Sequence, residues 1–179
     1  MPPARRAGEN GVKTKGMQPK ILGAFALVAF LQVTVLDAIG IFGLKPDLVM
    51  VLVIFYGFLF GQREGAFWGF VGGFLLDMAT GSYFGLNVLD HLVAGYLAGV
   101  VQSALYKDNP FVVSLTTLLV CFFSGLLHYL LLLYLGITVS PGVALFRIAF
   151  LAALYNAAVA LILFRWFFRA YKRSLPVSF

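Results

Sequence analysis

Five ionisable residues in the apolar part of this 179-residue chain have side chains that could do chemistry. They are Asp77, Asp90, His91, His128 and Arg147. A carboxyl or imidazole group held away from water can act as a general acid or base, and two carboxyl groups can share a proton. Ionisable side chains within hydrophobic segments are costly, so they usually face protein or water and often have a function. Whether these five residues could catalyse a reaction depends on their spacing.

The spacing does not indicate catalysis. The chain has no HExxH zinc motif and no GxxxxGK[ST] phosphate loop, and its single cysteine, Cys121, cannot form an intrachain disulfide. Ser124 and His128 are one helical turn apart, which supplies neither a base aimed at the hydroxyl nor an oxyanion hole. Nothing suggests a substrate bond between Asp77 and Asp90. We predict a protein that is not an enzyme, with no catalytic residue, no cofactor and no metal site.

A glycine pattern accounts better for this part of the chain. Glycine recurs at every fourth position from Gly57 to Gly85, and the one skipped position holds Asp77. Helical residues four apart share a face, and glycine lets a second helix approach closely, which matters most in lipid. We predict a helix-packing or partner-interface site. Its candidate residues are Gly69, Gly72, Gly73, Asp77, Gly81, Gly85, Asp90, His91 and Arg147.

Composition places these residues in an integral membrane protein. Hydrophobic residues make up 61% of the chain and charged residues only 11%, whereas about a quarter of an ordinary soluble domain is charged. The net charge of +6 does not indicate nucleic-acid binding, because the basic residues flank the hydrophobic segments. We predict an all-α polytopic membrane protein that contacts the lipid bilayer and no nucleic acid.

Apolar runs separated by polar or Gly/Pro-containing turns predict six transmembrane helices. They cover residues 21–41, 46–60, 64–78, 84–105, 111–135 and 143–168. Residues 1–20 are expected to form a disordered basic tail and residues 169–179 an irregular basic tail, with a six-helix domain at 21–168 between them. The second and third helices are short for a membrane, since 15 residues rise only about 22 Å, and they need shelter from longer neighbours or a thinner bilayer.

The distribution of basic residues predicts the orientation. With six spans, eleven of the thirteen Lys and Arg residues lie on one side, against Lys45 and Arg147 on the other. Both termini are therefore expected in the cytoplasm. This topology brings the ionisable groups near or within the spans toward the outer side, where one shared polar cavity or interface is expected. These groups are Asp37, Asp77, Asp90, His91, His128 and Arg147.

The expected partner of Arg147 in this cluster is Asp77 or Asp90. Three interpretations of the cluster stay open at this point. It can be a structural ion pair that fixes the helix register. It can be an outward-facing site for a partner or ligand, or some of its members can contact lipid headgroups.

The segment from Pro46 to Gly99 resembles the signature region of the MreD family, the rod shape-determining membrane proteins of bacteria. Pro46 opens the second helix, and Gly61 and Gly65 flank a hairpin. The remaining matching residues are Gly69, Gly72, Gly73, Asp77, Gly81, Gly85, Gly95, Tyr96 and Gly99. Asp90 and His91 have no clear place in this pattern.

The resemblance implies a non-enzymatic scaffold subunit of the cell-elongation machinery in the bacterial cytoplasmic (inner) membrane, with a role in peptidoglycan synthesis. The implied partners are an MreC-like single-span protein and, in a larger complex, RodA, a class B penicillin-binding protein and MreB. The family is also similar in architecture to the substrate-binding subunits of energy-coupling-factor vitamin transporters. A vitamin-binding membrane subunit is therefore the alternative function.

Overall fold

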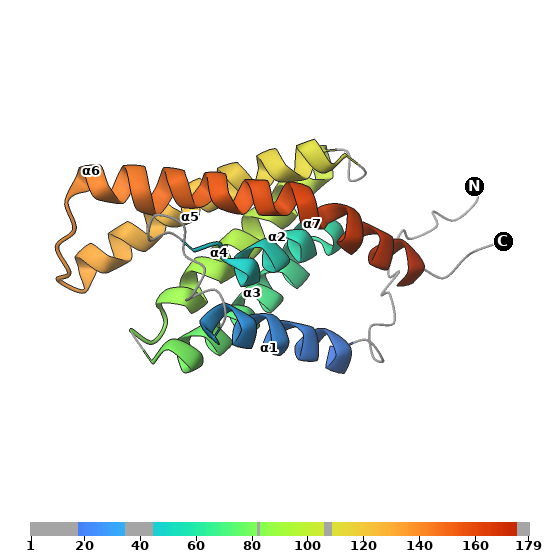
Figure 1. The fold of residues 1–179 in the computed structure, drawn as a ribbon, viewed down its shortest axis with the longest axis horizontal. Coiled ribbons are helices and arrows are strands. Elements are labelled where there is room, and N and C mark those ends of the chain that lie inside the picture. The colour runs from blue at the N-terminus through green and yellow to red at the C-terminus, as the bar shows by residue number, and fades with distance from the viewer. Residues whose placement is uncertain (1–17, 35–44, 82, 106–108, 175–179) are drawn as a thin grey trace, which may run out of the picture.

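The computed structural model describes residues 18–34, 45–81, 83–105 and 109–174 of the chain, and these residues are helical with short turns. Figure 1 shows their arrangement as a bundle of antiparallel helices. The first five are α1 (Gln18–Thr34), α2 (Leu48–Phe60), α3 (Gln62–Thr80), α4 (Leu86–Val101) and α5 (Pro110–Tyr134). The last helix is continuous from α6 (Pro141–Val143) through the π-helical η4 (Ala144–Leu151) to α7 (Ala152–Ser174).

Helix ends follow the local sequence. Asp47 caps α2, because its side chain accepts a hydrogen bond from the Met50 N–H. Asn109 caps α5 through the Phe111 N–H at 2.9 Å, with Pro110 at the first helical position, where a missing N–H costs nothing. Gly81 ends α3 in the left-handed conformation. These caps explain why α2, α3 and α5 begin or end within a few residues of the predicted positions.

The short helix α2 lies at the centre of the bundle. Ten of its thirteen residues are buried, and each of the three apolar core clusters contains α2 side chains. It packs against α1, α3, α4, α5 and α7. A helix that is apolar on all sides belongs in such a position. Its neighbours therefore cover this helix, whose length of about 20 Å is less than the thickness of a bilayer core of about 30 Å.

Aromatic side chains hold one end of the bundle together. Phe25 of α1 stacks on Trp68 of α3 with ring centroids 5.1 Å apart, and both rings contact Tyr56 of α2. Phe60, the last residue of α2, contacts Tyr171 near the end of α7 at 5.2 Å. The α2–α3 hairpin and the end of α7 therefore lie at the same end of the molecule, where α1 begins (Figure 1).

The structure differs from the sequence expectations at both tails and at the fourth helix, which ends at Val101 and not at Leu105. α1 begins at Gln18, so residues 18–20 are helical and not part of a disordered tail. α7 continues to Ser174, so residues 169–174, which we expected to be irregular, are helical. Aromatic packing explains the second difference, because Phe168 and Tyr171 stack and Lys172 lies over the Phe168 ring. The remaining residues of both tails lie outside the described part of the chain.

Length and hydropathy identify two described helices that are apolar enough to cross a membrane, Pro110–Tyr134 and Pro141–Lys172. The segments Ile21–Thr34 and Leu48–Phe60 are apolar but shorter. Large apolar side chains are exposed on α1, α3, α4, α5 and α7. An exposed apolar surface that extends over several helices of a bundle is suited to contact with lipid.

Candidate functional site

The predicted glycines of α3 bring its backbone against α4. Gly69 faces the carbonyl group of His91, and Gly73 faces that of Asn87. A methyl group on Gly73 would lie 2.6 Å from both the Asn87 carbonyl carbon and the Val88 Cα. The interface therefore has no room for any side chain at these positions, as expected for helices in close backbone contact. We call this surface the α3–α4 interface.

The other predicted glycines have different environments. Gly72 is on another face of α3, where an added Cβ would lie 2.8 Å from Val49 Cγ1 and 3.2 Å from the Phe25 ring. Gly81 and Gly85 lie in the turn between α3 and α4 with φ angles of 62° and 102°, and no atom would contact a Cβ added to either. They are needed for backbone conformation and not for close packing.

Asp77 receives the first N–H groups of α4. Its side-chain oxygens accept hydrogen bonds from the backbone N–H of Gly85 at 2.7 Å, Asn87 at 3.2 Å and Val88 at 3.3 Å. The Asn87 side-chain amide donates to it as well, at 2.8 Å. Gly85, the N-cap residue of α4, has no side chain that could do this. The carboxylate of α3 thus replaces a local cap and complements the positive end of the α4 dipole.

Asp90 links α4 to α5. The Ser124 hydroxyl donates to Asp90 Oδ1, and His128 Nδ1 lies 3.5 Å from Asp90 Oδ2. Asp90 is 7% exposed and Ser124 only 2%. The serine hydroxyl is directed at a carboxylate and not at a histidine nitrogen, so this arrangement joins two helices without activating the serine as a nucleophile.

His91 lies on the next position of α4 and points toward α2. Its side chain is fully buried; Nδ1 lies 2.9 Å from the Asn87 carbonyl oxygen and Nε2 lies 3.3 Å from Asp47 Oδ2. The second contact is an ion-pair distance without hydrogen-bond geometry. The His91 ring therefore lies between the Asn87 carbonyl group of its own helix and the carboxylate of the residue that caps α2.

Sequence reasoning missed Asp47 as the centre of a network. Its carboxylate also accepts from Gln32 Nε2 of α1 at 3.0 Å, and its N–H donates to Asn156 Oδ1 of α7 at 2.8 Å. Gln32 Oε1 accepts from the Val49 N–H at 3.0 Å. Three helices therefore meet at the Asp47 carboxylate, and α7 joins them through the Asp47 N–H. Gln32 was the available signal, since it is a polar residue inside an otherwise apolar run.

The polar residues that we expected in one cluster have different principal partners, and Asn87 contacts both Asp77 and His91. Asp77 binds the start of α4, Asp90 binds α5, and His91 binds Asp47. Arg147 lies in η4 with an exposed side chain, and its pairing with Asp77 or Asp90 stays a prediction. Asp37 lies outside the described residues. Within the described ranges, no three histidine, cysteine or acidic side chains gather as a metal-binding group would.

Comparison with known proteins identifies relatives of the chain. The family model described as rod shape-determining protein MreD matches residues 17–174. A curated relative, the "Rod shape-determining protein MreD" of Bacillus subtilis (strain 168), is 30% identical over 142 residues. The match covers 74% of this chain and 78% of that protein. No solved structure matches the chain.

Proposed function

Because the chain belongs to the MreD family of rod shape-determining membrane proteins, we propose that it is a non-enzymatic scaffold subunit of the bacterial cell-elongation machinery. It binds an MreC-like single-span protein and, in a larger complex, RodA, a class B penicillin-binding protein and MreB. The observation that carries the proposal is the family match over residues 17–174, which spans every described helix.

Six spans in the bacterial cytoplasmic membrane, with both termini in the cytoplasm, form part of this proposal. The beginning of α1 and the end of α7 lie at one end of the bundle (Figure 1). The exposed basic residues Arg63, Arg165, Arg169 and Lys172 belong to elements at this end, whereas Lys45 and Arg147 precede or begin helices at the other. This asymmetry supports the cytoplasmic assignment of the first end. A likeness to energy-coupling-factor subunits also remains a proposal.

The contacts of the candidate residues support a scaffold more than a ligand site. Asp77, Asp90 and His91 are buried, and each has partners within the chain. Their networks hold α4 to α2, α3 and α5, which gives the surface around them a fixed shape. The alternative vitamin-binding function would require some of these polar groups to face a ligand, and no contact among the described residues favours it.

The proposal is tested by co-purification and by complementation. The tagged chain is extracted in mild detergent from cells that also produce the MreC-like single-span protein of the same organism. An unrelated six-span membrane protein with the same tag serves as the control. We expect the single-span protein to elute only with the chain. Depletion of the chain should turn rods into spheres, and re-expression should restore rods. An absent complex together with unchanged cell shape would contradict the proposal.

A further inference from the structure

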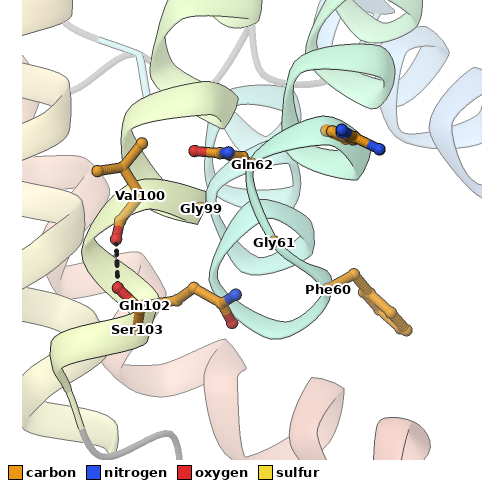
Figure 2. A pocket seen from close by; sticks show the side chains of 8 residues that line it. Phe60, Gly61, Gln62, Gly99, Val100, Gln102 and Ser103 are labelled. Atoms are coloured by element: carbon orange, nitrogen blue, oxygen red, sulfur yellow. Dashed lines mark hydrogen bonds between the residues drawn. The ribbon is translucent and has the colours of Figure 1, made fainter. Parts of the chain in front are cut away.

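A cavity lies between the α2–α3 hairpin and the end of α4, and its lining contains neither Asp47 nor Asp90. Its volume is about 540 Å³, and it is open on one side. The lining residues are Phe60, Gly61, Gln62, Arg63, Gly99, Val100, Gln102 and Ser103. Figure 2 shows the hairpin on one side of it and α4 with the short helix η3 (Gln102–Ala104) on the other. This volume is within the range of small-ligand sites.

Two glycines, Gly61 and Gly99, lie where the hairpin meets α4 beside the cavity. Gly61, at the hairpin, has a φ angle of 102°, and a Cβ there would lie 3.2 Å from Gln102 Nε2. Gly99 lies directly on the first residue of α3, where a Cβ would be 2.3 Å or less from Gln62 backbone atoms. Side chains at either position would push the hairpin away from α4 or fill the gap between them. The two glycines therefore set how closely the hairpin approaches α4 beside the cavity.

The polar groups of the cavity are incompletely satisfied within the protein. Gln102 Oε1 is buried and has no hydrogen-bond partner. The nearby Ser103 hydroxyl donates instead to the Val100 carbonyl oxygen at 3.0 Å (Figure 2). A buried acceptor without a donor is costly, and such a group in a folded protein calls for an explanation. A ligand that carries an N–H or O–H group would supply the missing donor.

Charge and surroundings indicate the class of ligand. Arg63 is the one charged residue in the lining, and its guanidinium group suits a phosphate oxygen. Next to the cavity, α4 and η3 expose apolar side chains: Val100 is 41% exposed, and Val101 and Leu105 are each 37% exposed. A cationic group and an acceptor in need of a donor thus belong to one cavity, beside exposed apolar side chains.

We propose that this cavity binds the headgroup of a membrane phospholipid whose phosphate contacts Arg63 and whose terminal ammonium or hydroxyl group donates to Gln102 Oε1. The acyl chains lie along the exposed apolar side chains of α4. Because Gln102 Oε1 is buried, the side-chain amide rotates on binding so that its oxygen faces the cavity. The site is independent of the rod-shape role, since it requires only that the chain be in a membrane.

The test measures lipid binding by the intact purified chain with native mass spectrometry in detergent. Phosphatidylethanolamine and phosphatidylglycerol carry a donor, whereas phosphatidylcholine has the phosphate but no donor. We expect the first two to bind at least about fivefold more tightly than phosphatidylcholine, as one additional polar contact would provide. Glycerol phosphate and inorganic phosphate, added as competitors, should displace neither lipid at equal concentration.

Two variants separate the two contacts. Arg63→Gln should weaken all three lipids by about fivefold, because each loses its phosphate partner. Gln102→Leu should abolish the preference for donor lipids, and its thermal midpoint without added lipid should equal or exceed that of the wild type, since a buried unsatisfied acceptor is removed. Arg165→Gln, an exposed arginine outside the cavity, is the control with a matched change in charge.

Three results would overturn the assignment. The first is an unchanged donor preference in Gln102→Leu. The second is equal weakening by Arg165→Gln and Arg63→Gln, which would show general surface attraction. The third is displacement of lipid by glycerol phosphate or inorganic phosphate at equal concentration, which would identify a soluble ligand.

Discussion

Two helix pairs in this molecule reach close contact in different ways. In the α3–α4 interface, backbone faces backbone: Gly65, Gly69 and Gly73 lie on carbonyl groups of α4. Between α5 and the last helix, small side chains remain in the contact. Alanines at 149, 153, 157 and 160 are buried there, and the Ser114 hydroxyl donates to the Ala157 carbonyl oxygen at 2.8 Å.

The two contacts differ in how far their atoms can move to make room for an added side-chain atom. A carbonyl group within a helix cannot rotate away without losing its helical hydrogen bond, so the α3–α4 interface tolerates no added atom. A contact made through methyl and hydroxyl groups can shift by small rotations or small helix displacements. The π-helical η4 opposite Gly125 is a further irregular element in the second contact. We therefore expect substitutions to cost more between α3 and α4 than between α5 and the last helix.

The largest effect is expected for Gly73→Ala. The new methyl group would collide with the Asn87 carbonyl group, so the helices must separate at the cost of their packing. We expect a loss of about 3 kcal/mol in the free energy of unfolding, or a fall of about 6–12 °C in the thermal midpoint measured in detergent. Gly23→Ala in α1 is the matched control, because nothing lies within 4 Å of its added Cβ. Its midpoint should not fall, since alanine favours the helix.

Equal midpoints for Gly73→Ala and Gly23→Ala would contradict the rigid backbone contact. A lower thermal midpoint for Gly73→Ala together with an unchanged elution volume would support the rigid contact further. The loss of stability would then come from poorer helix packing and not from aggregation. The same pair of variants can be compared in the co-purification experiment, where Gly23→Ala should retain the partner.

An intermediate effect is expected for Asp77. Asp77→Ala leaves three backbone N–H groups at the start of α4 without their acceptor, which should cost about 2 kcal/mol. Asp77→Asn keeps one oxygen acceptor and should cost about half of that. Thermal midpoints of the two variants provide the measurement. If Asp77→Asn were as costly as Asp77→Ala, the charge and not the hydrogen bonds would be the main contribution.

The same position tests the predicted pairing of Arg147. A double-mutant cycle of Asp77→Asn and Arg147→Gln compares the sum of the single effects with the double effect. A coupling energy above about 0.5 kcal/mol would support a direct pair, and additivity would show that Asp77 acts on α4 alone.

The smallest loss is expected for Gly125→Ala. Its added Cβ would lie 2.7 Å from the Ala149 Cα and 2.9 Å from the Ile148 carbonyl oxygen, a single close point in an otherwise side-chain-mediated contact. A shift of η4 can relieve part of this overlap, so we expect a loss of about 1 kcal/mol. A midpoint as low as that of Gly73→Ala would remove the proposed difference between the two interfaces.

Local patterns predicted the helices of this protein well and their interactions less well. The helical boundaries followed from Pro46, Gly81 and Pro110, because proline and glycine act on the backbone within one or two residues. The four-residue spacing of Gly69 and Gly73 indicated a close helix contact for the same reason. The extension of α7 past residue 168 was not predicted, because it depends on aromatic contacts with α2, which is distant in sequence.

The sequence by itself determined that the chain is helical and apolar, that it belongs to a membrane, and which residues share a helix face. Those properties depend on local geometry and on transfer from water, which composition and spacing record. Tertiary structure decided the partner of each polar group. Asp77 caps α4, Asp90 binds Ser124, and the Asp47 carboxylate reaches His91 across the bundle. The physical reason is that periodicity sets the face of a helix, whereas the distance and rotation of its neighbour depend on packing throughout the bundle.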